Sequence, residues 1–150
     1  MSDKGHSASS IVLLFSTVKA SEKLQRIFHL QPGSEVTKLE RIRLVDGLPI
    51  GLHKTFLNTA ITPLLDLKKY DFSSDSLYAA LAAEGIILGE AEESVEAGLA
   101  DNLQAQALNI LVGAPVLLLI RSTKLIDGRF YEYTEMVYRA DKYKYTIKLR

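Results

Sequence analysis

The chain has no cysteine and no tryptophan, and it holds only 4 prolines among its 150 residues. Without cysteine it has no disulfide and no thiolate for zinc binding or nucleophilic catalysis, a composition that fits a cytoplasmic protein. No apolar run is long enough to span a bilayer, so we expect no contact with a membrane. The 18 Lys and Arg residues equal the 18 Asp and Glu residues in number, so the segment offers no basic excess for a nucleic acid backbone.

The motifs of several enzyme classes are absent too. The sequence has no nucleophile elbow, no phosphate-binding loop, no dinucleotide fingerprint and no zinc-ligand spacing. Its 3 histidines are scattered, and we therefore expect no catalytic residue, no metal and no cofactor. No internal repeat is apparent. The length and the 47% hydrophobic content predict one globular domain with a core of its own.

Periodic patterns predict an α+β domain, in which helices lie on one side of a mostly antiparallel sheet of about six strands. Residues Met1 to Ser10 are small and polar and are predicted to be a linker, and the domain is expected to occupy residues 11–150. The segments with strand character are Ile11–Lys19, the hairpin Val36–Asn58, Ile86–Ala97, the hairpin Val116–Ala140 and Tyr143–Leu149. The segments with helix character are Ser21–Phe28, a segment from about Ser73 to Gly85, and Leu99–Leu111, with Leu103, Ala107, Leu108 and Leu111 facing the core.

The first hairpin carries two arginines on one face. Arg41 and Arg43 are separated by one residue, so on a strand both guanidinium groups leave the same side, roughly 7 Å apart. Two permanent positive charges repel each other unless an anion, or a carboxylate such as that of Glu35, lies between them. The pattern therefore predicts either a binding site for an anion or a surface charge ladder of low energy.

Three further residues fit the anion site. Ser76 falls in the first turn of the second predicted helix, where free amides favour a negative ligand, although a hydroxyl there is equally typical of a simple helix cap. Glu132 and Tyr138 share one face of the last hairpin strand and can bond ligand hydroxyls, the alternative being that Tyr138 packs in the core. Together these side chains indicate a receptor for a small anionic metabolite.

Four segments, taken together, resemble a known family. They are R-I-R-L-V-D-G-L-P-I from Arg41, S-L-Y from Ser76, G-A-P-V-L-L-L-I-R from Gly113 and D-G-R-F-Y-E-Y-T-E-M-V-Y-R-A-D-K-Y from Asp127. In this order and spacing they are similar to the UTRA domain, the effector-binding half of GntR-family transcription regulators of the HutC type. The resemblance extends over Ile11 to Arg150 and implies the chorismate lyase-like fold.

The resemblance implies a regulatory domain. Members of the family carry an N-terminal winged helix-turn-helix domain that this chain lacks, so DNA contact is expected only through that absent domain. They commonly form homodimers and sense small molecules, often sugar phosphates. Matched by position, the implied phosphate contacts are Arg41, Arg43, Ser76 and Tyr78, and the implied contacts to the rest of the ligand are Glu132 and Tyr138. The alternative function is that of a chorismate lyase-like enzyme of the same fold, which eliminates pyruvate.

One position departs from the family pattern. Sugar-phosphate sensors similar to this sequence have a glutamate where this chain has His53, so His53 is included among the candidate ligand contacts. An imidazole in place of a carboxylate removes a strong acceptor for hydroxyl groups. For His53 to share a face with Arg41, the hairpin loop must contain an odd number of residues, and we therefore expect a three-residue loop, Asp46-Gly47-Leu48.

Overall fold

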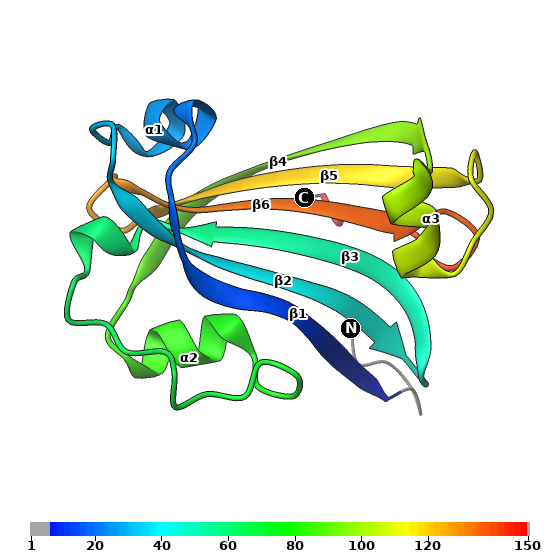
Figure 1. Cartoon of the computed structure of the whole chain (residues 1–150), viewed down its shortest axis with the longest axis horizontal. Coiled ribbons are helices and arrows are strands. Elements are labelled where there is room, and N and C mark those ends of the chain that lie inside the picture. Colours follow the sequence, from blue (N-terminus) through cyan, green and yellow to red (C-terminus); the bar gives the residue numbers. More distant parts are fainter. Residues whose placement is uncertain (1–6, 150) are drawn as a thin grey trace.

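The computed structural model describes residues 7–149 as one antiparallel sheet in the order β1-β2-β3-β6-β5-β4, with three helices (Figure 1). The strands are β1 (Ala8–Lys19), β2 (Glu35–Val45), β3 (Leu48–Leu57), β4 (Leu88–Leu99), β5 (Pro115–Leu125) and β6 (Phe130–Arg139). The helices are α1 (Glu22–Phe28), α2 (Leu77–Ala83) and α3 (Asn102–Leu108), with a 3-10 turn at Thr59–Ile61. The predicted α+β class and strand number are confirmed. Within the described residues no helix is long and apolar enough to cross a membrane.

The sheet consists of two similar halves, a repeat that the sequence alone does not make apparent. The units β1-α1-β2-β3 and β4-α3-β5-β6 meet at the β3–β6 pair. Both α1 and α3 begin after a side-chain cap, Ser21 or Asp101, and both end at a left-handed residue, His29 or Asn109, with φ 55°. These equivalent positions lie 80 residues apart in each case. Positions of β2 and β5 related by the same offset are therefore structurally equivalent.

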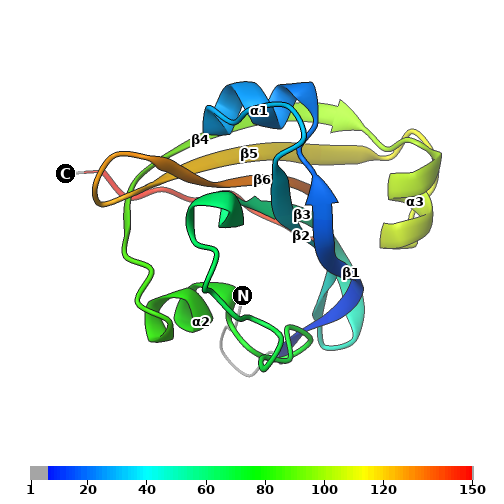
Figure 2. The ribbon, with the colours of Figure 1, turned by 60° about the vertical axis from the view of Figure 1, so that its left-hand side comes forward.

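The helices cover both faces of the sheet, whereas the sequence predicted one side (Figure 2). Helix α1 packs on Val36 and Tyr133, and α3 packs on Leu52. Helix α2 lies on the opposite face, against Leu39 and Leu57. Because successive residues of a strand point to opposite faces, Val36 of β2 contacts α1 and Leu39 of β2 contacts α2. The prediction that all helices share one side is therefore wrong, and the face with α2 has room for a pocket.

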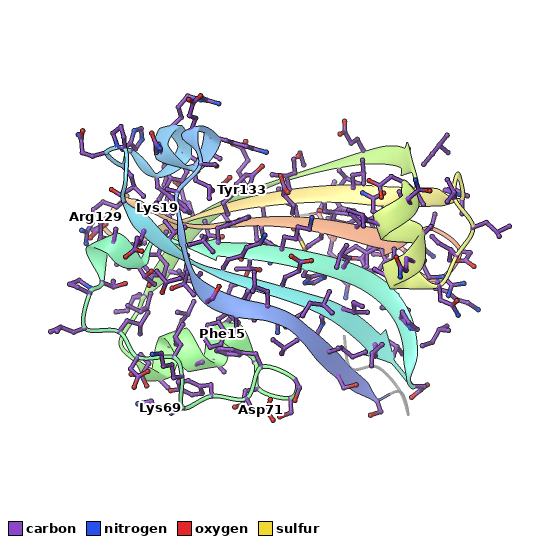
Figure 3. The ribbon with its side chains drawn as sticks, viewed as in Figure 1. Phe15, Lys19, Lys69, Asp71, Arg129 and Tyr133 are labelled. Atoms are coloured by element: carbon purple, nitrogen blue, oxygen red, sulfur yellow. The ribbon has the colours of Figure 1, made fainter. Side chains whose placement is uncertain are left out.

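The α2 side holds the largest buried cluster. Phe15 of β1 meets Phe72 edge-on, with ring centroids 5.3 Å apart, and lies on the α2 side of the sheet (Figure 3). Tyr131 is fully buried in the same cluster, and its hydroxyl lies 2.9 Å from the Thr62 hydroxyl. This packing fixes the segment between β3 and α2, and with it the start of α2, against the sheet.

The turn of the first hairpin is shorter than predicted. Asp46 and Gly47 form a two-residue loop, with φ 50° and 78°, and Val45 pairs directly with Leu48. Positive φ at both loop residues is typical of the tight turn that matches the twist of a hairpin. The predicted three-residue loop is therefore wrong.

A β-bulge replaces the missing loop residue. The register slips at Ile50, after which Arg43 pairs with Gly51 and Arg41 pairs with His53. A bulge inserts one residue into one strand and so reverses the face of every side chain beyond it. His53 consequently lies on the face of Arg41, as predicted, through the bulge rather than through the loop.

Both ends of the domain differ from the prediction. Strand β1 begins at Ala8, so residues 8–10 of the predicted linker belong to the sheet, while residues 1–6 lie outside the described residues. The segment 143–149 was predicted as a strand but forms none. Tyr143 and Tyr145 instead pack across the face of β5 and β6, on Leu119 and Met136.

Helix α3 is shorter than the predicted segment. Leu103 and Leu111 are 74% and 83% exposed, so the prediction that they face the core is wrong. Leu108 is buried as predicted and Ala107 packs against the same cluster, while Ala105 makes a further buried contact that was not predicted. Leu111 lies beyond the helix, which ends at Leu108, and Leu103 lies on the side opposite Ala105, because two residues turn a helix by about 200°.

Candidate functional site

A pocket of about 330 Å³ opens on the sheet face that carries α2. Its lining comes from four strands and the start of α2: Arg41, Arg43, His53, Thr55, Ser76, Leu77, Tyr78, Arg121, Glu132, Thr134 and Met136. Six of the seven candidate residues thus lie together, and the seventh, Tyr138, contacts His53. The pocket combines positive charge with hydroxyl groups.

A larger hollow, of about 490 Å³, lies at the β1 edge beside the 3-10 turn. The hydroxyl groups of its threonines 37, 59 and 62 are bonded within the protein: Thr37 contacts Thr59 at 2.9 Å, and Thr62 contacts Tyr131. Neither an arginine nor a histidine lines it. The smaller pocket is therefore the better candidate for recognition of a charged ligand.

Arg41 is a buried cation without a carboxylate partner among residues 7–149. It is 7% exposed, and its Nε forms no hydrogen bond within the described residues. Burial, followed by the charge of Arg43, lowers its pKa to about 10, which still leaves the side chain charged at neutral pH. Among residues 7–149 no carboxylate forms an ion pair with Arg41 or Arg43. The charge-ladder alternative, with Glu35 as a partner, is therefore not what the structure shows.

Arg43 is held in place from the neighbouring strand. It donates a hydrogen bond to the hydroxyl of Ser10 in β1. Ser10 belongs to residues 8–10, the part of β1 that was predicted from the sequence to be a linker. The hydroxyl directs the guanidinium without neutralising it, so the pocket carries two uncompensated positive charges on its β2 side.

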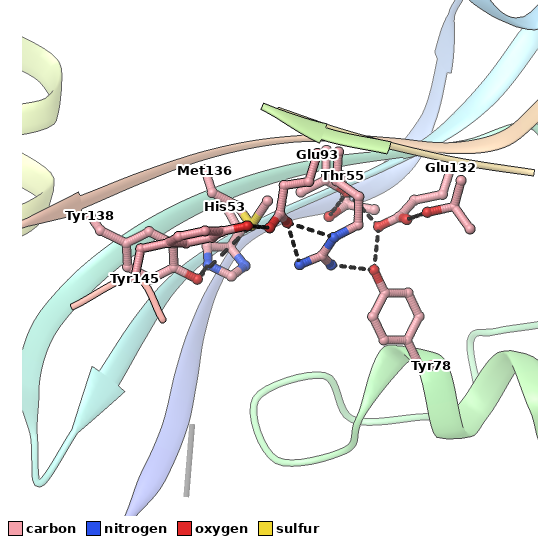
Figure 4. A network of polar contacts seen from close by, with 11 residues as sticks. His53, Thr55, Tyr78, Glu93, Glu132, Met136, Tyr138 and Tyr145 are labelled. Atoms are coloured by element: carbon pink, nitrogen blue, oxygen red, sulfur yellow. Dashed lines mark hydrogen bonds and ion pairs between the residues drawn. The ribbon is translucent and has the colours of Figure 1, made fainter. Parts of the chain in front are cut away.

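Glu132 is a buried carboxylate saturated by hydroxyl groups (Figure 4). It is 1% exposed and accepts hydrogen bonds from Thr123 at 2.6 Å, from Thr134 at 2.6 Å and from Tyr78 at 2.9 Å. Hydrogen bonds to the ionised form offset the cost of burying it. Glu132 therefore fixes Tyr78 and Thr134 in the pocket wall, and its direct contact with a ligand remains a prediction.

Arg121 connects this network to the C-terminal segment. It donates to the hydroxyl of Tyr78 and forms an ion pair with Glu93 of β4 at 3.0 Å. The other oxygen of Glu93 accepts a 2.7 Å hydrogen bond from Tyr145 (Figure 4). Burial, followed by Glu132, raises the pKa of Tyr78 to about 12, so its hydroxyl stays protonated as a donor. Arg121, unlike Arg41, has its own carboxylate.

Sequence reasoning missed Arg121, although a signal for it exists. Arg121 lies 80 positions after Arg41 and has the same place in β5 that Arg41 has in β2. The repeat thus brings a third arginine to the same face. Thr55, Thr134 and Met136 were also missed, because their approach depends on the pairing of β3 with β6.

His53 and Tyr138 form a bonded pair at one end of the pocket. His53 Nε2 lies 2.7 Å from the Tyr138 hydroxyl, and the rings meet edge-on at 5.3 Å. The ring of Tyr138 occupies the space above Gly51, where a Cβ would come within 2.7 Å of it. Tyr143 stacks on the other side of Tyr138 at 3.8 Å. Tyr138 therefore packs in the core, as the alternative reading held, and also reaches the candidate site.

His53 should make the domain less stable in mild acid. Burial, followed by Arg41, Arg43 and Arg121, lowers its pKa from 6.5 to about 3. Between these values the unfolded chain binds the proton and the folded chain does not, so stability falls as the pH drops below 6.5. From pH 7 to pH 5 the loss should be about 2 kcal/mol, or roughly 4–8 °C in Tm. Thermal unfolding of His53→Gln should lack this part of the pH dependence, and equal slopes in both proteins would contradict the assignment.

Ser76 caps α2 and also lines the pocket. Its hydroxyl oxygen accepts a hydrogen bond from the Ala79 amide at 3.2 Å, which is the simple capping role. The hydroxyl proton remains available to donate into the pocket. No group of three or more His, Asp or Glu side chains within residues 7–149 could hold a metal ion. The side-chain groups that this pocket offers are guanidinium, hydroxyl and imidazole groups.

Comparison with known proteins agrees with this architecture. The chain is 24% identical over 152 residues to the mannosyl-D-glycerate transport/metabolism system repressor MngR of Escherichia coli, covering 98% of this chain and 60% of MngR. It is 27% identical to the transcriptional repressor NagR of Bacillus subtilis, covering 97% of this chain and 59% of NagR. The chain thus spans about 60% of the length of these relatives.

The structure is similar to that of a solved effector domain. The crystal structure of the effector domain of PhnF from Mycobacterium smegmatis superposes with a TM-score of 0.88 at 29% identity, covering 97% of this chain and 89% of that one. The UTRA domain family matches residues 3–144. The chain therefore belongs to the UTRA domain family, whose members named above are transcriptional repressors.

Proposed function

We propose that this domain senses a small anionic metabolite, such as a sugar phosphate, for a GntR-type transcription regulator. The observation that carries the proposal is Arg41, a buried guanidinium with an unbonded Nε and no carboxylate partner among the described residues. A buried charge without a partner is costly, and an anionic ligand would supply the partner. MngR, by its name, serves a system for mannosyl-D-glycerate, an anionic sugar derivative, which agrees with this ligand class.

In this proposal Arg41 and Arg43 bind the anionic group, together with Ser76 and Tyr78. His53, Glu132 and Tyr138 surround the rest of the ligand. The ligand favours one of two conformations of the domain, and a preceding DNA-binding domain reads the difference. A useful switch requires a difference in binding free energy of about 1–3 kcal/mol between the conformations. The whole regulator would act in the cytoplasm as a homodimer.

Thermal unfolding in the presence of ligands tests the anion site. Sugar phosphates, phosphorylated amines, dicarboxylates and inorganic phosphate are compared, each at saturating concentration. A ligand at a hundred times its Kd should stabilise the domain by about 2.7 kcal/mol, which raises Tm by several degrees. Arg43→Ala should lose this shift, whereas Arg26→Ala, an exposed arginine of α1 on the other face, should keep it. An equal response of both variants would refute the site.

The competing enzymatic function predicts a different result. A chorismate lyase-like enzyme would release pyruvate from chorismate, which a coupled pyruvate assay detects. We expect no release, because MngR and NagR are named as repressors. Pyruvate formation that disappears in Arg43→Ala would favour the enzyme instead.

A further inference from the structure

The two equivalent arginines of the repeat have different neighbours on the outer strands. Arg41 of β2 pairs with Val12 of β1, whose side chain carries no acceptor. Arg121, the equivalent residue of β5, pairs with Glu93 of β4. Its Nε and its Nη2 each lie 3.0 Å from Oε1 of that carboxylate. The repeat therefore places an arginine at this position with or without a carboxylate beside it, so the fold itself does not require the charge of Glu93.

Arg121 lies between Glu93 and the pocket. The arginine belongs to the pocket lining, whereas Glu93 does not. On the pocket side its Nη1 donates a hydrogen bond to the hydroxyl of Tyr78, one of the implied phosphate contacts. These contacts leave some of the N–H groups of the guanidinium free to donate to a ligand. An anion that reaches Arg121 would therefore meet a cation whose charge Glu93 already balances.

Glu93 and an anionic ligand would compete for this one guanidinium. The side chains of Arg121 and Glu93 are only 30% and 22% exposed, so water screens their charges incompletely. The negative charge of Glu93 also acts on the far end of the site: burial raises the pKa of Tyr138, and Glu93 contributes in the same direction. A phosphate beside Arg121 would bind the arginine and at the same time repel Glu93.

Glu93 also connects Arg121 to the C-terminal segment. Its second oxygen, Oε2, accepts a 2.7 Å hydrogen bond from the hydroxyl of Tyr145 (Figure 4), and this bond raises the pKa of that hydroxyl. Tyr145 packs on the face of β5 and β6 next to Tyr143. A change at the ion pair of Arg121 and Glu93 would therefore be felt by the side chain of Tyr145.

We propose that Glu93 is an internal counter-ion of Arg121, that an anionic ligand displaces it, and that it thereby sets the affinity of the pocket and links occupancy to the C-terminal segment. The proposal rests on the proposed function, since the anion must first bind at Arg41 and Arg43. On displacement Arg121 exchanges a carboxylate oxygen of Glu93 for an oxygen of the ligand, and Glu93 keeps the hydrogen bond from Tyr145. Glu93 is thus a positioning residue, because it acts on the ligand through Arg121.

Isothermal titration calorimetry with inorganic phosphate tests the competition. Glu93→Gln keeps the shape of the side chain and an acceptor oxygen but removes the charge, and it should bind phosphate about 3- to 10-fold more tightly than wild type. Glu92→Gln makes the same change of charge at an exposed neighbour on β4 and should stay within about twofold of wild type. Arg121→Met should weaken binding, and Glu93→Gln added to it should have no further effect, because the competition acts through the guanidinium.

Nuclear magnetic resonance of isotope-labelled tyrosine rings tests the link to the C-terminal segment. The ring signals of Tyr145, assigned with the Tyr145→Phe variant, should move when phosphate saturates the wild-type domain, because Glu93 loses its cation. In Glu93→Gln the same signals should move less, because that variant has no charged group to displace.

The outcomes separate the two proposals. If Arg43→Ala loses phosphate while Glu93→Gln, shown by thermal unfolding to be folded, binds it no more tightly than wild type, the competition is refuted and the anion site stands. Weaker binding by Glu93→Gln would mean that Glu93 only supports Arg121, which also refutes the competition. Unchanged Tyr145 signals in wild type at saturating phosphate would refute the displacement. If phosphate binds neither wild type nor Glu93→Gln, the proposed function fails for phosphate and this inference fails with it.

Discussion

Replacing Arg41 by methionine should make the ligand-free domain more stable while weakening its affinity for phosphate compounds. Methionine keeps an apolar stem of similar length but removes a buried charge that has no carboxylate partner and that faces a second arginine. We expect a gain of about 1–2 kcal/mol, or roughly 3–6 °C in Tm. The loss of a charge-assisted contact should weaken anion binding by about 10- to 100-fold. Thermal unfolding and calorimetry measure the two effects on the same samples.

The opposite signs of these effects are what identify a functional residue. A residue kept for stability costs stability when it is replaced, whereas a binding residue often does the reverse. Arg26→Met is the matched control, because Arg26 is exposed on α1 and forms no ion pair within the described residues. It should change neither stability nor binding. Destabilisation by Arg41→Met would show that Arg41 is structural and would remove the main support for the anion site.

Replacing Glu132 by alanine should destabilise the domain by about 2–4 kcal/mol. Three hydroxyl groups, of Thr123, Thr134 and Tyr78, would lose their acceptor in the interior of the protein. The side chain is 1% exposed, so water reaches the site poorly and compensates little. Urea unfolding followed by circular dichroism measures the change in the free energy of unfolding.

Two variants show whether the effect comes from the hydrogen bonds. Glu132→Gln keeps the shape and one carbonyl acceptor, and should cost only about 1 kcal/mol. Glu135→Ala lies on the same strand, and its carboxylate forms a half-exposed ion pair with Lys23, so it should cost at most about 0.5 kcal/mol. If Glu132→Ala were as mild as Glu135→Ala, the buried network would contribute little to folding.

Features of this fold that depend on a few neighbouring residues are visible in the sequence. The cap at Ser21, the Asp-Gly turns and the two arginines on one face are encoded within a few residues each, and the structure has them where the sequence predicts them. Local geometry sufficed because capping and side-chain alternation depend on neighbours in the chain.

Segments whose partner is remote were less predictable. The alternating residues of the C-terminal segment fit a strand, yet Tyr143 stacks on Tyr138 and Tyr145 bonds to Glu93, so the segment lies on the sheet face. Alternating residue types indicate that the two sides of a segment have different surroundings, but they do not indicate what packs on each side. For the same reason, the sequence did not show that helices cover both faces of the sheet.

The sequence by itself determined the class of the domain, its main elements and the pair of arginines that makes an anion site plausible. Only the tertiary structure decided that His53 lies beside the two arginines, because a bulge at Ile50 places its side chain on the same face of the sheet as Arg41. Only the register of β5 on β6 brings Thr123 to Glu132 and Arg121 into the same pocket. Strand register is fixed by packing across the whole sheet, and no residue carries that information alone.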